Sequence, residues 1–300
     1  MTIGPGQLEI ANLRMLLAMA VAEDLGGGDI TAAMLPPDVP AAGILVAREP
    51  LLLCGGVFIA EICAAYDPAI TVGLQAGEGD ELAAGAVIAR INGPACGVMA
   101  AERVVLNFLQ RLSGIATLTG EYVRAVSGTG VEIVDTRKTT PGWRTLEKYA
   151  VRCGGGGNHR MGLYDAILIK DNHLAVLAAA GVDEPITQLA ISFPGVRASF
   201  GEENGFIEIE VDTLEQFDAA LPLGADVIML DNMSPDQMRQ AVMRRDEAGM
   251  AGKVALEASG GITLQNVRQA AETCVERIAL GALTHSARAV DIALDIEVAG

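Results

Sequence analysis

Hydrophobic residues recur at helical spacing near the start of the chain and then give way to short strand-like runs. The helical pattern extends from Leu8 to Glu23, where the glycine run of EDLGGGDIT ends it. Two strand-like runs follow, Gly43–Ala47 and Leu51–Leu53, and turn glycines separate them. The pattern therefore predicts a compact α/β region in this first part of the chain.

A long helical pattern follows this region. It runs from Val98 to about Ser127, and the pair Ser113–Gly114 predicts a break between two helices. We place the boundary here, between an α/β domain of residues 1–115 and a second domain of residues 116–285.

Beyond this helical pattern, six apolar runs alternate with segments of helix length. This alternation predicts a parallel sheet that is closed, or nearly closed, into a barrel. With six clear strands, an eightfold barrel and an incomplete one are both compatible with the pattern. The runs are VEIVDTR, AILIKDN, FIEIEVD, DVIMLDN, VALEASGG and RIALGALTH.

Each of these runs ends in polar or charged residues. In a barrel the carboxyl ends of the strands converge on one face, so residues far apart in sequence would surround a single pocket. The residues at or just past these ends are Arg137, Lys138, Lys170, Asp171, Glu210, Asp212, Asp231, Asn232, Ser259, Gly260 and His285.

Composition and charge narrow the class of protein. A chain of 300 residues that is 51% hydrophobic, with few aromatic residues and 35 glycines, is typical of an aliphatic α/β protein. The net charge of −17 disfavours a general role in binding nucleic acid or anionic membranes. The segment from Arg103 to Lys170 nevertheless holds ten Lys and Arg against five Asp and Glu. Within it we expect five cations to lie on solvated helix faces: Arg111, Arg124, Arg144, Lys148 and Arg152.

The start of the chain and the cysteines favour a soluble cytoplasmic protein. MTIGPGQLEI has neither a basic segment nor an apolar run, and the longest apolar stretch, around Leu174 to Val182, is too short to cross a bilayer. The cysteines are odd in number and lack a CxxC pair, which argues against a disulfide framework or a zinc site. We expect buried small apolar residues at Cys54, Cys63, Cys96, Cys153 and Cys274.

The expected pocket combines cations with carboxylates. Arginine meets a carboxylate or phosphate in two parallel hydrogen bonds, so several arginines together imply more than one anionic group. Glu210 and Asp231 would hold Mg²⁺ through water or accept hydrogen bonds from ribose hydroxyls. In the alternative interpretation, these cations and carboxylates pair with each other and have a structural role. The cations are Arg103, Arg137, Lys138, Arg160 and Lys170.

Two common nucleotide motifs do not fit. CGGGGNHR, Cys153–Arg160, is glycine-rich like a phosphate loop, but it lacks the GxGxxG spacing and the GKS or GKT ending. DVIMLDN has one acidic residue where the common phosphoribosyltransferase loop has an adjacent acidic pair. A dinucleotide fold, a P-loop and that larger enzyme class are therefore disfavoured.

The segment Asp135–His173, DTRKTTPGWRTLEKYAVRCGGGGNHRMGLYDAILIKDNH, resembles the signature block of the quinolinate phosphoribosyltransferases. EDLGGGDIT, AERVVLNFLQRLSGIAT, IEIEVDTLEQ, LDNM, EASGGIT and ALGALTHS also resemble family motifs in the family's order, so the resemblance covers most of the chain. It implies an incomplete TIM-like α/β barrel, of about six to seven strands, with an amino-terminal α/β sandwich domain. The carboxyl-terminal segment, about residues 286–300, would return to that domain.

The resemblance also implies an activity. Such an enzyme joins quinolinate to phosphoribosyl pyrophosphate and releases CO₂ and pyrophosphate to form nicotinate mononucleotide, in NAD biosynthesis. The cofactor would be Mg²⁺, and no organic cofactor is needed, because the ribosylated ring nitrogen stabilises the carbanion left by decarboxylation. The active sites would be composite, within a homodimer.

The resemblance assigns a role to each matching residue. Arg103, Arg137, His159, Arg160 and Lys170 would hold the two quinolinate carboxylates. Lys138 would reach the phosphates, and Glu210 and Asp231 would face the ribose and Mg²⁺. These three residues would form the catalytic set. Ser259, Gly260, Gly281 and His285 would bind the 5′-phosphate, and Arg48 would come from the neighbouring subunit.

Three other functions remain as alternatives. Phosphoribosylation of nicotinate, a monocarboxylate, would not require so many converging cations. A catalytically silent sensor of pyridine metabolites would be expected to lose Lys138, Glu210 or Asp231, which are all present. A molybdenum-associated paralogous family shares the fold, but it usually lacks the DTRKTTPG and GGGxNHR motifs found here.

Overall fold

The computed structural model describes residues 4–36, 39–200 and 205–298. The chain folds into two compact units. Unit 1 comprises Met1–Gly120, Lys138–Gly156 and Ala282–Gly300, and unit 2 comprises Glu121–Arg137 and Gly157–Gly281. This division interleaves the chain. The sequence instead predicts a domain of residues 1–115, to which about residues 286–300 return, and a barrel domain of residues 116–285, and those bounds stay a prediction.

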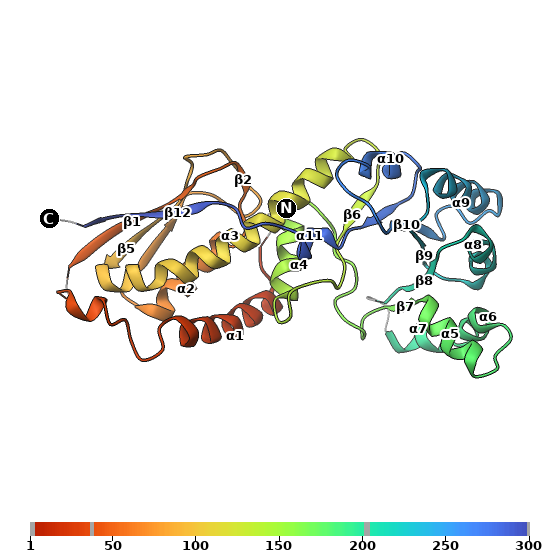
Figure 1. Cartoon of the computed structure of the whole chain (residues 1–300), viewed down its shortest axis with the longest axis horizontal. Helices are drawn as coiled ribbons and strands as arrows, with labels where there is room; N and C mark the ends of the chain where they lie inside the picture. The colour runs from red at the N-terminus through yellow and green to blue at the C-terminus, as the bar shows by residue number, and fades with distance from the viewer. Residues whose placement is uncertain (1–3, 37–38, 201–204, 299–300) are drawn as a thin grey trace. The chain divides into compact units, whose positions relative to one another are not determined.

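Unit 1 is built on a four-stranded antiparallel sheet. Its strand order is β12-β1-β5-β3, so the last strand of the chain pairs with the first, and Ala47 lies opposite Ile292. Figure 1 shows helix α2, Ile59–Tyr66, beside this sheet. The strands are β1 (Pro40–Ala47), β3 (Thr71–Leu74), β5 (Val87–Pro94) and β12 (Ile292–Val298), and β2 (Leu51–Leu52) pairs separately with β4 (Glu81–Leu82).

The helix predicted from Leu8 to Glu23 is present. Helix α1, Gln7–Asp24, ends before Gly26 and Gly28, whose positive φ angles turn the chain out of the helix. Single turns of 3₁₀ helix follow as η1 (Ala32–Met34) and η2 (Gly56–Phe58).

The predicted break at Ser113–Gly114 is wrong. Helix α3 runs without interruption over Ala95–Ala125. A Cβ at Gly114 would lie 2.0 Å from the carbonyl oxygen of Arg288, so the glycine lets another segment of backbone pack against the helix. A close approach, and not a turn, explains this glycine.

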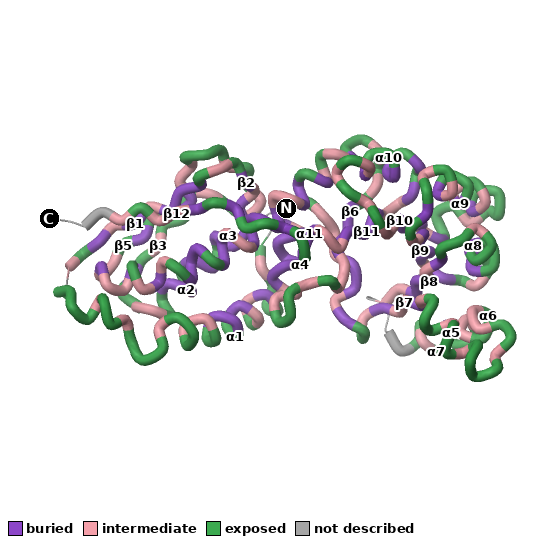
Figure 2. The backbone as a smooth tube through the Cα atoms, in the orientation of Figure 1, coloured by how far each residue is buried: buried purple, intermediate pink, exposed green. Residues whose placement is uncertain are grey.

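Unit 2 is the expected barrel-like unit. Its six-stranded parallel sheet has the order β6-β11-β10-β9-β8-β7, and all six predicted strands are present. Helices α8, α9 and α10 lie along its outer side in Figure 1, and Figure 2 shows buried segments along β8, β9 and β10. The strands are β6 (Glu132–Val134), β7 (Ile167–Ile169), β8 (Ile207–Val211), β9 (Val227–Asp231), β10 (Ala255–Ser259) and β11 (Arg277–Ala279).

The sheet continues beyond β6 through one isolated parallel bridge, between Val134 and Gly157. A Cβ at Gly157 would meet the carboxylate of the exposed Glu132 side chain, which would have to move aside. The bridge starts the segment that leads through His159 and Arg160 towards β7.

The structure corrects two expectations about which side chains are buried. Lys148, on α4, is completely buried, and Arg111 is largely buried against Glu147, so neither lies on a solvated helix face. Cys54, Cys63 and Cys153 are buried as expected, but Cys274 is exposed. The helices are α4 (Arg144–Cys153), α5 (Asp171–Ala179), α6 (Pro185–Ala190), α7 (Phe193–Phe200), α8 (Leu214–Ala220), η3 (Leu221–Leu223), α9 (Pro235–Glu247), α10 (Val267–Ala271) and α11 (Ala282–His285).

No helix in residues 4–36, 39–200 and 205–298 has the combined length and apolarity needed to cross a membrane.

Candidate active site

Two oppositely charged side chains meet at the carboxyl ends of β7 and β8. Lys170 directly follows β7, and Glu210 lies on β8 with its side chain on the same face as Glu208. The Lys170 ammonium forms an ion pair with the Glu210 carboxylate. The structural pairing considered as an alternative therefore exists here, and a bound anion would have to compete with Glu210 for Lys170.

A small acidic cavity adjoins this ion pair. Its volume is about 60 Å³, and the carboxylates of Asp171, Glu210, Asp212 and Asp231 line it together with apolar and amide groups. All four acids were predicted at strand ends, and the structure brings them together. Hard cations such as Mg²⁺ prefer oxygen ligands of this kind, so the donor set fits that ion.

The neighbouring strand ends on β9 and β10 carry the residues expected to bind a phosphate. Asp231 and Ser259 are register partners, and the Asn232 amide donates to the Ser259 carbonyl over 2.8 Å. Gly260 has a φ of +85°, and a Cβ there would lie 2.2 Å from the Asn232 side-chain oxygen. Gly281 follows β11 at the same end of the sheet.

Two arginines in unit 2 lie close enough to repel each other. Arg160 is only 9% exposed as a residue, and its Nη1 donates to the carbonyl of Ala166 over 3.0 Å. Its buried Nε has no hydrogen-bond partner in the described part of the chain. Burial, and next the positive charge of Arg137, lower the pKa of Arg160. A buried donor near a second guanidinium is a favourable place for an anion.

His159 lies beside Arg160 and is engaged by the protein on both ring nitrogens. Its Nδ1 accepts a hydrogen bond from the Arg160 backbone amide over 2.8 Å, and its Nε2 lies 2.8 Å from a carboxyl oxygen of Glu208. Its own backbone amide donates to Asp135 over 2.9 Å. The direct contact with quinolinate that the resemblance implies for His159 stays a prediction.

Glu208 and Glu257 form a buried acidic pair around His159. Both are completely buried, and burial is the main reason why the pKa rises to about 7 for Glu208 and about 8 for Glu257. Arg277 Nε lies 3.2 Å from the Glu257 carboxylate and opposes part of this rise. Neither residue was among those predicted from the sequence, although the alternation in IEIEV places Glu208 on the same face as Glu210.

Four of the expected site residues belong to unit 1. Arg103 is exposed on α3, and Arg48 is exposed and paired with Asp295 over 2.5 Å. The side chain of Lys138 is exposed, and Nδ1 of His285 lies 2.7 Å from the hydroxyl of Ser286. The other nine lie in unit 2: Arg137, His159, Arg160, Lys170, Glu210, Asp231, Ser259, Gly260 and Gly281.

A buried ion pair in unit 1 shapes the segment that follows Lys138. Arg111 Nη2 lies 2.6 Å from Glu147, and the same carboxylate accepts hydrogen bonds from the hydroxyl and the amide of Thr140. Arg111 also donates to the carbonyl of Thr284, whose hydroxyl donates to the carbonyl of Lys138 over 2.8 Å. Arg111 therefore has a structural role in this segment.

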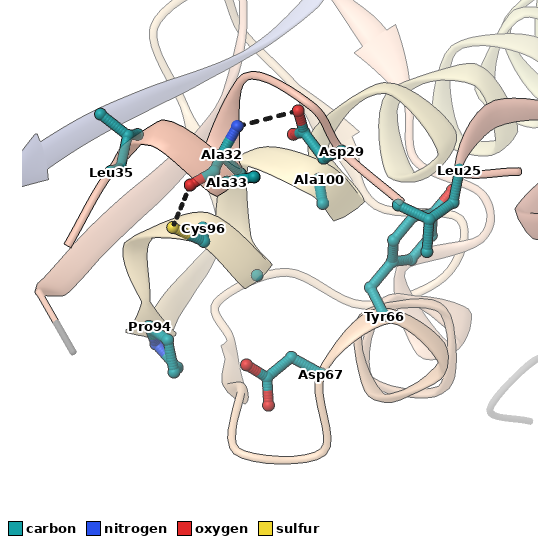
Figure 3. Close-up of a pocket in the computed structure, with 11 residues that line it drawn as sticks. Leu25, Asp29, Ala32, Ala33, Leu35, Tyr66, Asp67, Pro94, Cys96 and Ala100 are labelled. Atoms are coloured by element: carbon teal, nitrogen blue, oxygen red, sulfur yellow. Dashed lines mark hydrogen bonds between the residues drawn. The ribbon is translucent and has the colours of Figure 1, made fainter. Parts of the chain in front are cut away.

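A larger cavity lies elsewhere in unit 1, between the chain after α1 and the start of α3 (Figure 3). Its volume is about 640 Å³, and its charged lining residues are Asp29 and Asp67. The Asp29 carboxylate accepts the amide of Ala32 over 3.0 Å. No cation among the described residues lines this cavity, so it does not suit a polyanionic substrate.

The glycine run before His159 has packing roles. A Cβ at Gly154 would lie 2.4 Å from the carbonyl oxygen of Ala116 on α3, and Gly155 adopts a φ of +84° after the end of α4. With Gly157 in the bridge to β6, these glycines are explained without a phosphate, as the motif spacing indicated.

Comparisons with known proteins agree with this architecture. The family models described as Quinolinate phosphoribosyl transferase, N-terminal domain and C-terminal domain match residues 29–113 and 115–295. The chain is 42% identical to a probable nicotinate-nucleotide pyrophosphorylase (carboxylating) of Bacillus subtilis, over 95% of this chain and 93% of that protein. It is also 42% identical to the nicotinate-nucleotide pyrophosphorylase (carboxylating) of Mycobacterium leprae, over 94% and 96%.

A solved structure shows the same fold over the full length. The nicotinate-nucleotide pyrophosphorylase of Francisella tularensis superposes with a TM-score of 0.85 at 35% identity, and the match covers 99% of both chains. The identity over nearly the whole chain and the two family models lead to one assignment: the chain belongs to the quinolinate phosphoribosyltransferase family.

Proposed function

We propose that the protein is a quinolinate phosphoribosyltransferase (decarboxylating). It transfers the phosphoribosyl group of phosphoribosyl pyrophosphate to the ring nitrogen of quinolinate and releases pyrophosphate and CO₂. The product is nicotinate mononucleotide, a precursor of NAD. The proposal rests on family membership and on the chemistry of the strand ends in unit 2.

The observation that carries the proposal is the state of Arg160. Arg160 is 9% exposed as a residue, and its buried Nε–H has no partner among the described residues. Such a buried donor is costly unless a ligand satisfies it. Arg137 adds a second positive charge nearby. A dicarboxylate such as quinolinate would supply acceptors for both groups and relieve their repulsion.

We assign the remaining substrate contacts as proposals. The residues assigned to quinolinate binding are Arg103, Arg137, His159, Arg160 and Lys170. Lys138 contacts the pyrophosphate, and Arg48 belongs to a neighbouring subunit's site. Ser259, Gly260, Gly281 and His285 bind the 5′-phosphate. The neighbouring Gly261, which has open space at its Cβ position, lets an anion approach the backbone there.

Glu210 and Asp231 would hold Mg²⁺, directly or through water, because their oxygens line the small acidic cavity with Asp171 and Asp212. When bound, this ion would neutralise charge that develops on pyrophosphate as it leaves.

The proposed mechanism uses positioning and electrostatics. The arginines hold the dicarboxylate so that the ring nitrogen faces the anomeric carbon of the ribose. The bond to pyrophosphate breaks ahead of the attack, and the carboxylates of Glu210 and Asp231 stabilise the positive charge that develops on the sugar. After the new C–N bond has formed, the 2-carboxylate departs as CO₂ and leaves its bonding electron pair on the ring carbon. The adjacent cationic nitrogen stabilises this carbanion, which then takes up a proton.

We further propose a homodimer with composite active sites, working in the cytoplasm. A symmetric dimer is the commonest soluble assembly and allows each subunit to lend the same residue to the other. The five cysteines are free, which suits a reducing compartment.

The direct test incubates purified protein with quinolinate, phosphoribosyl pyrophosphate and Mg²⁺. We expect nicotinate mononucleotide and CO₂ in equal amounts, measured by chromatography and by release from carboxyl-labelled quinolinate. Binding of quinolinate without turnover, with all substrates and Mg²⁺ present, would favour the silent sensor instead.

Substrate specificity separates quinolinate from nicotinate. We expect kcat/KM for nicotinate to be lower by about a thousandfold or more, because the buried cations that meet the 2-carboxylate would stay unpaired. Comparable values for the two pyridines would contradict the proposed function.

A further inference from the structure

The His159 ring is held in one orientation and one tautomer. Because its Nδ1 accepts the backbone N–H of Arg160 over 2.8 Å, that nitrogen carries no proton. The proton of the neutral ring therefore lies on Nε2, which faces the Glu208 carboxyl oxygen at 2.8 Å. A doubly protonated ring would direct Nδ1–H against the Arg160 amide.

The surrounding side chains leave the ring little freedom. Phe206 packs edge-on against it, with ring centroids 5.3 Å apart, and Asp135 holds the His159 backbone amide. Asp135 also accepts from the side-chain amide of Asn158 over 2.7 Å. His159 is only 6% exposed, so its ring is better placed to support Arg160 than to meet a substrate.

We infer that Glu208 is a positioning residue for quinolinate binding: its buried carboxyl group fixes the His159 ring, and this ring holds the backbone that aims the Arg160 guanidinium. The inference rests on the proposed function of the chain. Glu208 lies on β8 and His159 on the segment that crosses from β6 to β7, so their hydrogen bond links β8 to the segment that carries Arg160.

Glu257 does not take this role. Its nearest carboxylate oxygen lies 3.5 Å from His159 Nε2, beyond a good hydrogen bond, and its other oxygen lies 3.2 Å from Arg277. Glu208 and Glu257 have the same chemistry and are both completely buried, so they form a matched pair for substitution.

The kinetic test compares Glu208→Leu with Glu208→Gln. In Glu208→Leu we expect the KM for quinolinate to rise about tenfold while the KM for phosphoribosyl pyrophosphate changes less than about twofold. In Glu208→Gln the amide oxygen can still accept the Nε2–H, so most of the affinity for quinolinate should return. An equal rise of both KM values in Glu208→Leu, or no recovery in Glu208→Gln, would overturn the inference.

Glu257→Leu is the control for general disturbance of the barrel interior. It removes an equally buried carboxyl group, and we expect lower thermal stability without a selective rise of the KM for quinolinate. A selective rise as large as that of Glu208→Leu would show that the effect does not pass through the bond to His159.

A double-mutant cycle tests the path through His159. If Glu208 acts only through the ring, Glu208→Leu should add less than about twofold to the KM for quinolinate in a His159→Ala background. Independent, multiplying effects would contradict this path.

Nitrogen NMR gives a readout that does not depend on activity. The chain has three histidines, so ¹⁵N-histidine labelling and substitution of His173 and His285 identify the His159 signals. We expect the Nε2–H tautomer in the wild type and exchange between tautomers in Glu208→Leu. An Nδ1–H tautomer in the wild type would overturn the inference. If the wild-type protein binds quinolinate but makes no nicotinate mononucleotide, only the proposed function is contradicted.

Discussion

At Arg137, the geometry of the guanidinium should matter more for quinolinate binding than its charge. We expect Arg137→Lys to weaken quinolinate binding by roughly tenfold to a hundredfold, because lysine keeps the charge but cannot make two parallel hydrogen bonds to a carboxylate. Direct calorimetric titration with quinolinate measures the change. Arg124→Lys, an exposed cation on α3, is the control. Unchanged affinity in Arg137→Lys would mean that Arg137 faces another ligand or has a structural role.

The buried carboxyl of Glu257 should make stability depend on pH. Its pKa of about 8 lies above the ordinary value of 4.5 that applies in the unfolded chain, so the folded state binds more protons between these values. Stability should therefore be highest at low pH within this window and fall as pH rises from about 5 to 9. The raised pKa of Glu208 acts in the same direction.

Thermal unfolding of Glu257→Gln measures this contribution. The variant should gain stability relative to the wild type at pH 9, by a few degrees in Tm, and gain less at pH 5, where the wild-type carboxyl group is already mostly protonated. Glu215→Gln, on the exposed start of α8, should leave the pH dependence unchanged. Parallel pH curves for the wild type and Glu257→Gln would show that Glu257 does not titrate in this window.

At the scale of elements, apolar runs separated by segments of helix length were enough to locate the six barrel strands and the residues that follow them. The side chains of Glu208, Glu257 and Arg277 share one face of the sheet with Glu210, but composition gives no reason to expect buried charges there. Their partners are contributed by other strands and by the segment at His159. Side chains of this kind can be recognised only when tertiary contacts are known.

Helix patterns were less informative about packing. Lys148 was expected on a solvated face because lysine is rarely buried, yet α4 is covered by neighbouring segments of unit 1, including α1. Ser113–Gly114 was interpreted as a break because glycine disfavours helices. The local sequence does not show that the backbone of Arg288 packs against the helix at Gly114 and occupies the space that a side chain there would fill.

The close approach at Gly114 can be tested by adding one methyl group. We expect Gly114→Ala to lower stability by about 1–3 kcal/mol, because the new Cβ meets a backbone carbonyl that cannot move freely. Gly195→Ala is the matched control, since Gly195 is also helical and has open space at its Cβ position, so it should be neutral or mildly stabilising. Equal Tm values for Gly114→Ala and the wild type would show that the segment at Arg288 can shift at little cost.

At the scale of the whole molecule, the family resemblance places Arg48 in the active site of a second subunit. In this chain Arg48 pairs with Asp295, and both side chains are substantially exposed. Exposed pairs of this kind contribute about 0–1 kcal/mol, so Arg48 can leave Asp295 for an anionic substrate at little cost. The composite site therefore requires no rearrangement of the core of unit 1.

Complementation between two inactive variants tests the composite site. Arg48→Ala and Lys138→Ala homodimers should each be nearly inactive, because every site in either dimer lacks one cation. After dissociation and reassociation of a mixture, each heterodimer has one site with both residues and one site with neither. Random pairing makes half of the dimers mixed, so activity should recover to roughly a quarter of the wild-type value. If mass spectrometry confirms subunit exchange and no activity returns, Arg48 does not act across the interface, and the site is not shared between subunits.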